Sequence, residues 1–236
     1  MILFNVMNPS LMLFRGLVAM AAMTSLSSCA VTYQFDPIEA WVVDAETGKP
    51  IEGAVVTANW ELVKGSLDGP RYYGQLEVKE TVTDKNGRFF FEGFSRDDDS
   101  WAELRESDPQ VLIFKAGYEY QRFSNDYRDG GSGLKKLRRT AAVNGKTVKL
   151  LSMLSPEANK LQSRSVYSGL GIYYRRLVDD CYWKSIPRAI VAMDKEYKRL
   201  KAANPNSYVD LIRADTLVSL TEKCGSSTYL FQGQQK

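Results

Sequence analysis

The sequence predicts a mostly β protein with an α-helical C-terminal part, in which a β-sandwich is followed by a disulfide-closed helical hairpin. Two observations support this fold class. Short segments rich in β-branched and aromatic residues alternate with turn residues over residues 36–153, which is typical of a sandwich rather than of alternating β and α units. Apolar residues then recur at helical intervals within residues 154–236. We therefore expect two regions, 36–153 and 154–236.

The first two predicted strands, residues 38–45 and 51–60, flank a tight connection. Gly48 supplies a left-handed backbone position there, and Pro50 blocks premature ladder pairing. In the second strand, small and large apolar residues occupy every other position, so that they share one face: Ala54, Val56, Ala58 and Trp60. This alternation predicts a strand with one buried face.

A second hairpin is predicted around residues 84–87. Asp84 opens and Gly87 closes a type I turn between strands at 80–83 and 88–92. The remaining predicted strands are residues 111–115, 118–123 and 147–153. The longer connections are residues 62–76, 93–109 and 125–146. Long loops on a rigid sandwich are where binding usually occurs.

The C-terminal region shows helix signals. Ser155 and Pro156 are typical of a helix start. A clear apolar stripe with intervals of three and four residues predicts the next helix: Ile186, Ile190, Met193, Tyr197 and Leu200. Residues 204–206 (Asn-Pro-Asn) end that helix, and Ser207 with Asp210 is typical of the start of another.

The N-terminus is predicted to be an export signal. Residues 17–23 form an apolar run preceded by Arg15, and this run is too short to be a permanent membrane span. Leu26-Ser27-Ser28-Cys29 resembles the lipobox of bacterial lipoproteins. The resemblance implies a signal peptide over residues 1–28, lipid on Cys29, and a lipidated spacer over residues 29–35. Several acyl chains together give durable anchoring to a membrane.

Details of the export signal stay open. Ala30 follows the cysteine in place of Asp, and this resembles enterobacterial lipoproteins destined for the outer membrane. We therefore expect the cell envelope, with the outer membrane favoured over the inner one and the globular part in the periplasm. The alternative is a single membrane anchor that runs back through residues 11–14. The start codon is open between Met1, Met7 and Met12.

The number of cysteines, three, is consistent with the predicted lipoprotein signal. If Cys29 carries lipid, Cys181 and Cys224 are left to pair in an oxidising compartment. Cys181 precedes one predicted helix and Cys224 follows its antiparallel partner. Because each helix rises ~1.5 Å per residue, helices of similar length bring these ends back to the same place. We therefore predict a Cys181–Cys224 disulfide.

Three segments resemble the carboxypeptidase regulatory-like domain. Residues 43–56 are similar to the opening of that domain, residues 83–91 to its Thr-Asp-x-x-Gly-x-Phe hairpin, and residues 115–118 to the Gly-Tyr pair after a later strand. The resemblance covers residues 36–153 and implies a transthyretin-like (prealbumin-like) β-sandwich. It implies a fold and no reaction.

The composition excludes several enzyme classes. The chain contains no histidine, which excludes Ser-His-Asp triads, Cys-His pairs and histidine-based zinc sites. A glycosidase needs two suitably spaced carboxyl groups, and the sequence singles out no such pair. The acidic run Asp97-Asp98-Asp99 lacks the spacing of a calcium loop. We predict no catalytic residue, no metal and no cofactor.

The leading functional hypothesis is a non-enzymatic protein-binding or scaffolding module of the envelope, held by membrane lipid through Cys29. One alternative is a carbohydrate-binding module that stacks sugars on Tyr72, Tyr73 and Trp101; another is an accessory subunit of an envelope hydrolase. A basic cluster is a candidate contact for anionic lipid or glycan: Lys135, Lys136, Arg138 and Arg139.

Charge separates the two regions. Residues 30–150 contain 17 Lys and Arg against 20 Asp and Glu, whereas residues 151–236 contain 13 against 8. The net charge of the whole chain is only +3, which is too small to indicate a nucleic-acid partner. The uneven distribution instead indicates two units with different surroundings.

Overall fold

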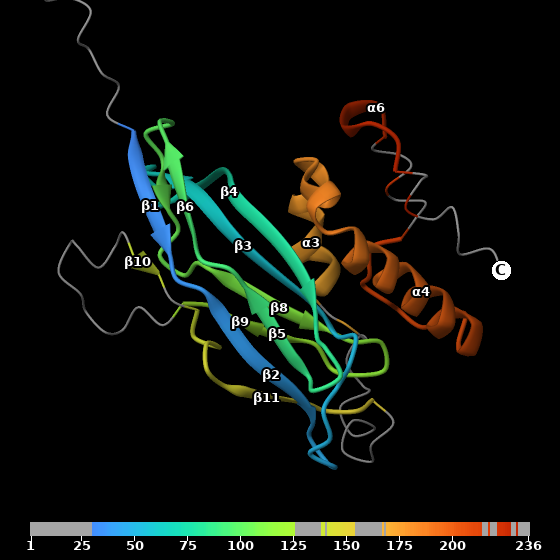
Figure 1. Ribbon diagram of the computed structural model, residues 1–236. Coiled ribbons are helices and arrows are strands. Elements are labelled where there is room, and N and C mark those ends of the chain that lie inside the picture. Colours follow the sequence, from blue (N-terminus) through green and yellow to red (C-terminus); the bar gives the residue numbers. More distant parts are fainter. Residues whose placement is uncertain are drawn as a thin grey trace, which may run out of the picture.

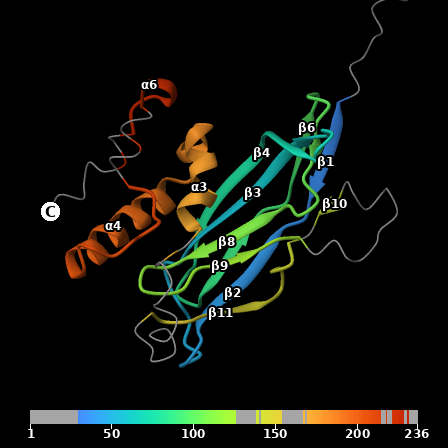
Figure 2. The ribbon, with the colours of Figure 1, turned by 180° about the vertical axis from the view of Figure 1, so that it is seen from behind.

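The computed structural model describes residues 30–125, 138–139, 141–153, 167, 169–213, 217, 221–227 and 230. These residues form a β-sandwich that carries a helical subdomain on the outer face of one layer (Figure 1). Figure 2 shows the same arrangement from behind. The predicted fold class, a mostly β protein with a disulfide-closed helical part at the C-terminal end, is confirmed.

One layer of the sandwich is a sheet with the strand order β4-β3-β8-β9, in which β7 also pairs with β3. Its strands are β3 (Val55–Lys64), β4 (Arg71–Val82), β7 (Glu103–Leu104), β8 (Gln110–Phe114) and β9 (Gln121–Phe123). The facing layer consists of two smaller sheets, β11-β2-β5 and β10-β1-β6. Their strands are β1 (Val31–Phe35), β2 (Ile38–Asp44), β5 (Arg88–Phe91), β6 (Phe94–Asp98), β10 (Arg138–Arg139) and β11 (Thr147–Leu150).

The two layers enclose the main apolar core. Alternate side chains of β3 point into it, and the predicted set of Ala54, Val56, Ala58 and Trp60 is buried as expected. The facing layer contributes Ile38 and Val42 from β2 and Phe89 and Phe91 from β5. These residues alternate with more exposed ones along their strands, because successive side chains of a strand point to opposite faces.

The other face of β3 is buried as well. Val55 belongs to a second apolar cluster, to which the sheet also contributes Val78, Leu112 and Phe114. The helices cover this face with large apolar side chains, among them Leu170, Tyr174, Leu177, Ile186, Ile190 and Met193. The sheet therefore separates two apolar cores. β3 is buried on both faces, because the facing layer covers one face and the helices cover the other.

The hairpin predicted at residues 84–87 is confirmed. The Gly87 amide donates to the carbonyl of Asp84 at 2.9 Å, and the Asp84 carboxylate accepts from the amides of Asn86 and Arg88. Gly87 has a φ of 73°, and a Cβ atom there would lie 2.3 Å from the carbonyl oxygen of Val42. Only glycine fits, because both the backbone conformation and the close approach exclude a side chain.

Two stretches expected to be irregular contain strands. Residues 31–35, predicted as a spacer, form β1, which pairs antiparallel with β6 inside the predicted loop 93–109. The reason is burial: Tyr33 and Phe35 alternate inward and belong to the main core. The predicted loop 62–76 is also largely strand, since β3 and β4 form one long hairpin with a turn between Lys64 and Arg71.

The helical subdomain consists of α3 (Leu170–Asp179), the short 3-10 helix η2 (Tyr182–Ser185), α4 (Pro187–Ala203) and α6 (Thr221–Cys224). Helix α4 carries the predicted apolar stripe and ends before Asn204 as predicted. Its N-terminus is capped from the sheet: the Glu80 carboxylate accepts from the amides of Arg188 at 3.0 Å and Ala189 at 2.7 Å. Such a contact satisfies helix donors that have no partner inside the helix.

The helix expected to begin at Ser207 is absent from residues 207–213, which run without helical structure. Asp210 explains the difference. Its carboxylate accepts from the Gly169 amide at 3.0 Å, and its carbonyl accepts from the Gly171 amide at 3.0 Å. This segment is therefore held against the start of α3, and a tertiary contact outweighs the local helix signal.

The predicted disulfide is present. Cys181 and Cys224 are bonded with their Cα atoms 5.2 Å apart, and the bond joins the segment after α3 to α6 across 43 positions of sequence. Cys224 is buried in the second apolar cluster. In the part of the chain that the structure describes, no helix is long and apolar enough to span a membrane.

Candidate functional site

Two of the three aromatic residues proposed to stack on sugars, Tyr72 and Tyr73, contact charged side chains of this protein. The Tyr72 hydroxyl donates to the carboxylate of Asp180, and the Arg176 guanidinium lies 4.5 Å from the centre of its ring. Tyr72 thus joins β4 to α3, and burial together with the Asp180 contact raises the pKa of its phenol. Tyr73 points to the opposite face and is half-exposed, with the Lys64 ammonium 3.6 Å from its ring centre.

The other predicted site residues are only partly described. Cys29, Lys135 and Lys136 lie outside the described residues. Arg138 and Arg139 are described through their backbone, as β10, which pairs in parallel with β1. Within the acidic run, Asp97 accepts from the Thr32 hydroxyl at 2.7 Å and Asp98 from the Ser100 hydroxyl at 2.7 Å. Among the described residues, no three or more Cys, Asp or Glu side chains are arranged so that they could hold a metal ion together.

A buried polar network lies between β3 and α3. Glu61 is held between two arginines, with Arg105 at 2.6 Å and Arg176 at 3.2 Å. The Asp108 carboxylate accepts from the Glu61 amide. Asp108 is fully buried, and burial raises the pKa of its carboxyl to about 7. Sequence reasoning missed this network.

The network continues along the outer face of β3. The Tyr174 hydroxyl lies 3.0 Å from that of Thr57, and the Tyr173 hydroxyl donates to the side chain of Asn59. The signal was present in the sequence: Thr57, Asn59 and Glu61 alternate with apolar residues along an otherwise apolar strand. Polar residues at every second position predict either solvent or polar partners on that face. Here α3 supplies the partners.

Two adjacent carboxyl groups, one with a raised pKa, are a common feature of acid–base sites. Both groups are engaged in this protein. Glu61 accepts from Arg176 through both oxygens, and Asp108 binds a backbone amide. Both carboxyl groups are buried. The two described cavities are lined by other residues. The arrangement acts as a bridge between sheet and helix.

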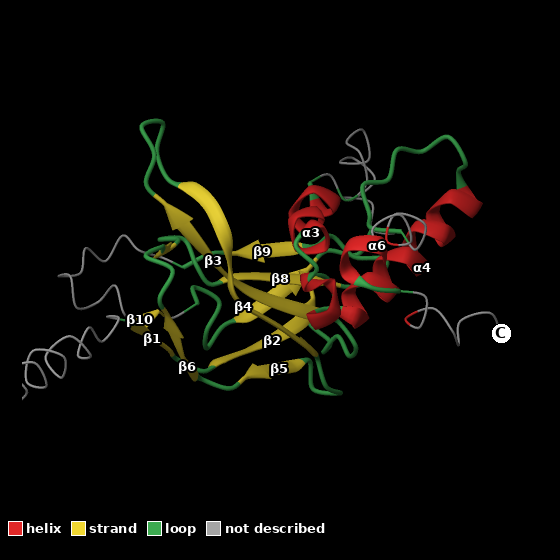
Figure 3. Ribbon diagram, turned by 90° about the horizontal axis from the view of Figure 1, so that it is seen from above, coloured by secondary structure: helices red, strands yellow, loops and turns green. Residues whose placement is uncertain are grey.

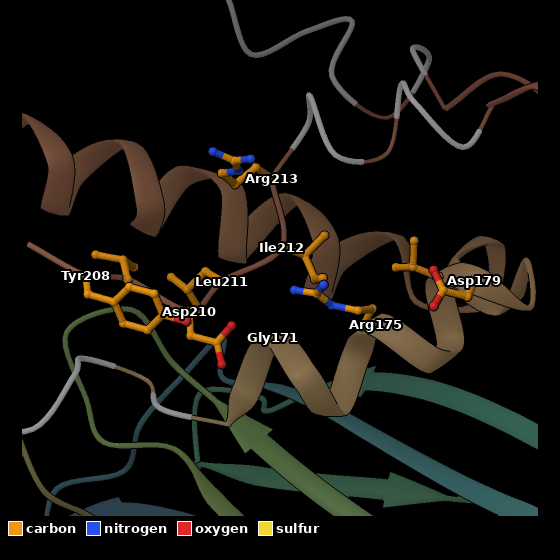
Figure 4. Close-up of a pocket in the computed structure, with 10 residues that line it drawn as sticks. Gly171, Arg175, Asp179, Tyr208, Asp210, Leu211, Ile212 and Arg213 are labelled. Carbon is orange, nitrogen blue, oxygen red and sulfur yellow. The ribbon is translucent and has the colours of Figure 1, made fainter. Parts of the chain in front are cut away.

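One cavity lies beside the helices, between α3 and residues 208–213 (Figure 4). It has a volume of about 280 Å³. Gly171, Arg175 and Val178 line it from one face of α3, and Tyr208 and Arg213 line it from the facing segment. Arg175 and Tyr208 are exposed, and the Tyr208 side chain is 70% accessible. A second, shallower cavity of about 350 Å³ lies between the end of β1 and the start of β6.

Large apolar side chains are exposed at one end of the sandwich. Val31, Leu67, Tyr73 and Trp101 are four of the six such residues in the described chain; the others are Phe90 and Tyr208. We call these four residues the apolar end. Strand pairing brings them to one end, because β1 pairs with the strand that leads into Trp101, and β7 after Trp101 pairs beside the β3–β4 turn that holds Leu67.

No family model and no curated protein matches the sequence. Solved structures with similar parts include 3-chlorocatechol 1,2-dioxygenase from Rhodococcus opacus 1CP, at 15% identity over 52% of this chain and 61% of that chain, with a TM-score of 0.29. The group B streptococcus pilus 2b backbone protein matches at 16% identity over 52% and 43%, with a TM-score of 0.26. The shaft pilin SpaA from Lactobacillus rhamnosus GG matches at 15% over 52% and 50%, with a TM-score of 0.23. The chain spans less than two thirds of each of these proteins, and likenesses this distant carry no functional argument.

Proposed function

We propose that this protein is a lipid-anchored, non-enzymatic binding or scaffolding module of the bacterial cell envelope. The observation that carries the proposal is the position of β1. The lipobox-like segment ends at Cys29, and the first core strand begins at Val31, so that only Ala30 lies between them. In this proposal, cleavage before Cys29 leaves the folded domain directly at the membrane, with the outer membrane favoured because Ala30 takes the place of Asp.

Metabolic labelling tests the anchor. We expect the wild-type protein to incorporate an alkyne fatty acid and to sediment with membranes, because the thiol of Cys29 is the acceptor. The Cys29→Ser protein should lose both properties. The Cys181→Ser, Cys224→Ser protein is the matched control and should keep the label. A Cys29→Ser protein that still takes label or still sediments with membranes contradicts the anchor.

We also propose membership of the carboxypeptidase regulatory-like family, because the three segments that resemble it contact one another. The Gly53 amide donates to the Thr83 carbonyl at 2.9 Å, and the Thr83 amide donates to the Ala54 carbonyl at 2.9 Å. The Tyr118 hydroxyl donates to the Asp44 carboxylate at 3.1 Å. These residues stabilise turns of the sandwich, so the resemblance concerns the fold. The function must be inferred from surface residues.

The helical cavity is the proposed partner site. Arg175 and Arg213 lie on its two sides, and Tyr208 is exposed at its edge (Figure 4). Asp179 and Asp210 also line the cavity, but the Asp210 carboxylate is occupied by the Gly169 amide. Residues 151–236 carry an excess of Lys and Arg, whereas residues 30–150 carry an excess of Asp and Glu. Complementary charge fixes which partners bind. We therefore propose an acidic protein segment as the partner, with Tyr208 as its aromatic anchor.

Site-specific photo-crosslinking tests the partner site. A photo-reactive residue in place of Tyr208 should capture a protein in intact cells, and the yield should fall when Arg175 is changed to Glu. Phe90 is the matched control, because it is also an exposed aromatic residue but lies on β5. Equal capture from both positions, or capture from Tyr208 that is indifferent to Arg175→Glu, contradicts the proposed site.

A further inference from the structure

We propose that the apolar end of the sandwich lies against the bilayer that holds the lipid of Cys29, so that the side chains of the domain orient it on the membrane. The partner of this surface is the interfacial region of a zwitterionic lipid layer. The inference rests on the proposed lipidation of Cys29 and adds a second contact to it.

The tether is short. Cys29 precedes Val31 by two positions, and a fully extended chain advances at most about 3.6 Å per residue. The first residue of β1 therefore lies within ~7 Å of the lipidated residue. Val31 is itself exposed. The end of the sandwich that contains Val31 must then face the membrane surface closely.

The other members of the apolar end lie at the same end of the strands. Val31 pairs with Asp98, Glu103 pairs with Val63, and the Tyr33 hydroxyl donates to the Ala102 carbonyl. The chain from 98 to 103 thus links the start of β1 to the β3–β4 hairpin. Figures 1 and 2 show that β1 begins and β6 ends at this end. Figure 3 shows the β1–β6 pair and the β3–β4 turn at separate corners of the side away from α4.

Trp101 has no role in the packing of the described chain. Its side chain is 87% exposed, and it belongs to neither apolar cluster. Its backbone has a φ of 57°, which is unfavourable for a bulky residue. Leu67 at the hairpin turn is also fully exposed. Tryptophan and tyrosine are enriched where proteins meet the membrane–water interface, because one part of the ring is apolar and the other polar.

Charge determines which lipid surface fits. Acidic residues outnumber basic ones at this end: Asp68, Asp97, Asp98, Asp99 and Glu103 against Lys64, Arg71 and Arg96. An anionic leaflet attracts basic residues and repels acidic ones. Burial of apolar side chains, and not charge, is therefore the proposed source of the contact. The contact should weaken when anionic lipid is added.

Tryptophan fluorescence tests the contact. The full lipidated protein is reconstituted into phosphatidylcholine vesicles with or without bromine atoms on the acyl chains, which quench nearby indoles. Of the four tryptophans, Trp60 and Trp183 are buried inside the protein. We expect brominated lipid to quench Trp101 alone, so that the loss of emission does not exceed the contribution of one tryptophan. That loss should disappear in Trp101→Phe, persist in Trp41→Phe, and shrink with anionic lipid.

The outcomes separate this inference from the anchor. A protein without acyl label that fails to float with vesicles contradicts the proposed lipidation. A labelled protein that floats but shows no quenching, or equal quenching in Trp101→Phe, overturns the membrane contact alone. A change in Trp101 emission on addition of glycan fragments, without quenching by brominated lipid, would also overturn the membrane contact. That result would favour carbohydrate binding.

A dye at the hairpin turn gives an independent readout. An environment-sensitive dye attached to Leu67→Cys should shift its emission to the blue when the protein enters vesicles, because the turn moves into a less polar layer. The same dye on Tyr208→Cys, an exposed position in the helical subdomain, should not shift. Equal shifts at both positions, or none at Leu67, overturn the proposed orientation.

Discussion

Replacing Asp108 by asparagine should remove a pH-dependent weakness of the fold. The carboxyl group of Asp108 is fully buried, and its pKa is raised to about 7, whereas an unfolded chain has an aspartate pKa near ~3.9. The folded state therefore binds this proton more tightly. The contribution to stability is full below the unfolded pKa of about 4 and is lost as the pH rises to about 7.

The magnitude follows from the size of the shift. About three pKa units at ~1.4 kcal/mol each give an upper bound of ~4 kcal/mol for the loss between acid and neutral pH. Asparagine does not ionise, and its side-chain oxygen can still accept from the Glu61 amide, as the carboxylate does. We thus expect Asp108→Asn to match the wild type near pH 4 and to exceed it by a few kcal/mol at pH 8.

Urea denaturation from pH 4 to pH 8 measures this difference. Comparing the variant with the wild type at each pH cancels groups that act in both proteins. Glu196 is one such group: contacts with Arg199 and Tyr167 outweigh its burial and lower its pKa, so its contribution is lost toward acid. Parallel free-energy curves for the two proteins, or a variant that loses stability relative to the wild type as the pH rises, would refute the reasoning.

Three further changes test individual features. Serine at Cys181 and Cys224 should lower the free energy of unfolding by about 4 kcal/mol, measured by urea denaturation, because the loop of 43 positions is no longer closed; an unchanged midpoint would contradict this. Gly87→Ala should cost at least ~2 kcal/mol, but Gly48→Ala only about 1, since of these two positions only Gly87 would place a Cβ against backbone. Similar losses in thermal melts would show that the clash is relieved. Trp101→Gly should raise stability by up to about 1 kcal/mol by relieving the left-handed backbone, and a destabilised variant would mean that the indole packs in the fold.

Local features of the fold could be predicted from the sequence. The Asp84–Gly87 turn and the buried face of β3 depend on residues close together in the chain, and both were found where expected. The disulfide was predictable because Cys181 and Cys224 are the pair that remains once Cys29 is assigned to lipid. Each of these inferences uses only spacing and the chemistry of the residues involved.

What the sequence did not predict depends on distant contacts. The sequence predicts a spacer where β1 lies, because the place of β1 in the core requires β6, whose residues pair with it from Phe35 with Phe94 to Val31 with Asp98. Residues 207–213 carry helix-start signals, yet Asp210 binds the amides at the start of α3. The Glu61 network was missed although polar residues alternate along β3, because the pattern does not name the partner. The apolar end likewise needs strand register, since Leu67 and Trp101 lie in separate loops.

The helical subdomain depends on the sheet for its core. Val55, Leu112 and Phe114 are part of the apolar cluster that packs α3 and α4, and β3 carries polar partners for α3 along the same face. β2, by contrast, contributes to the main core. Loosening the helices should therefore expose the outer face of β3 and β8, because local opening follows the contacts that are lost.

Hydrogen exchange on the Cys181→Ser, Cys224→Ser protein tests this dependence. We expect faster amide exchange in α3, α4 and α6, and a smaller increase in β3 and β8, while β2 and β5 keep the protection of the wild type. The gradient follows from the two cores, since only the central sheet belongs to both. If amide exchange is faster only in the helices, the central sheet is stable without the helices packed on its outer face. Equal acceleration in β2 would mean that both cores unfold as one unit, and the sheet that contains β3 and β8 would not separate them.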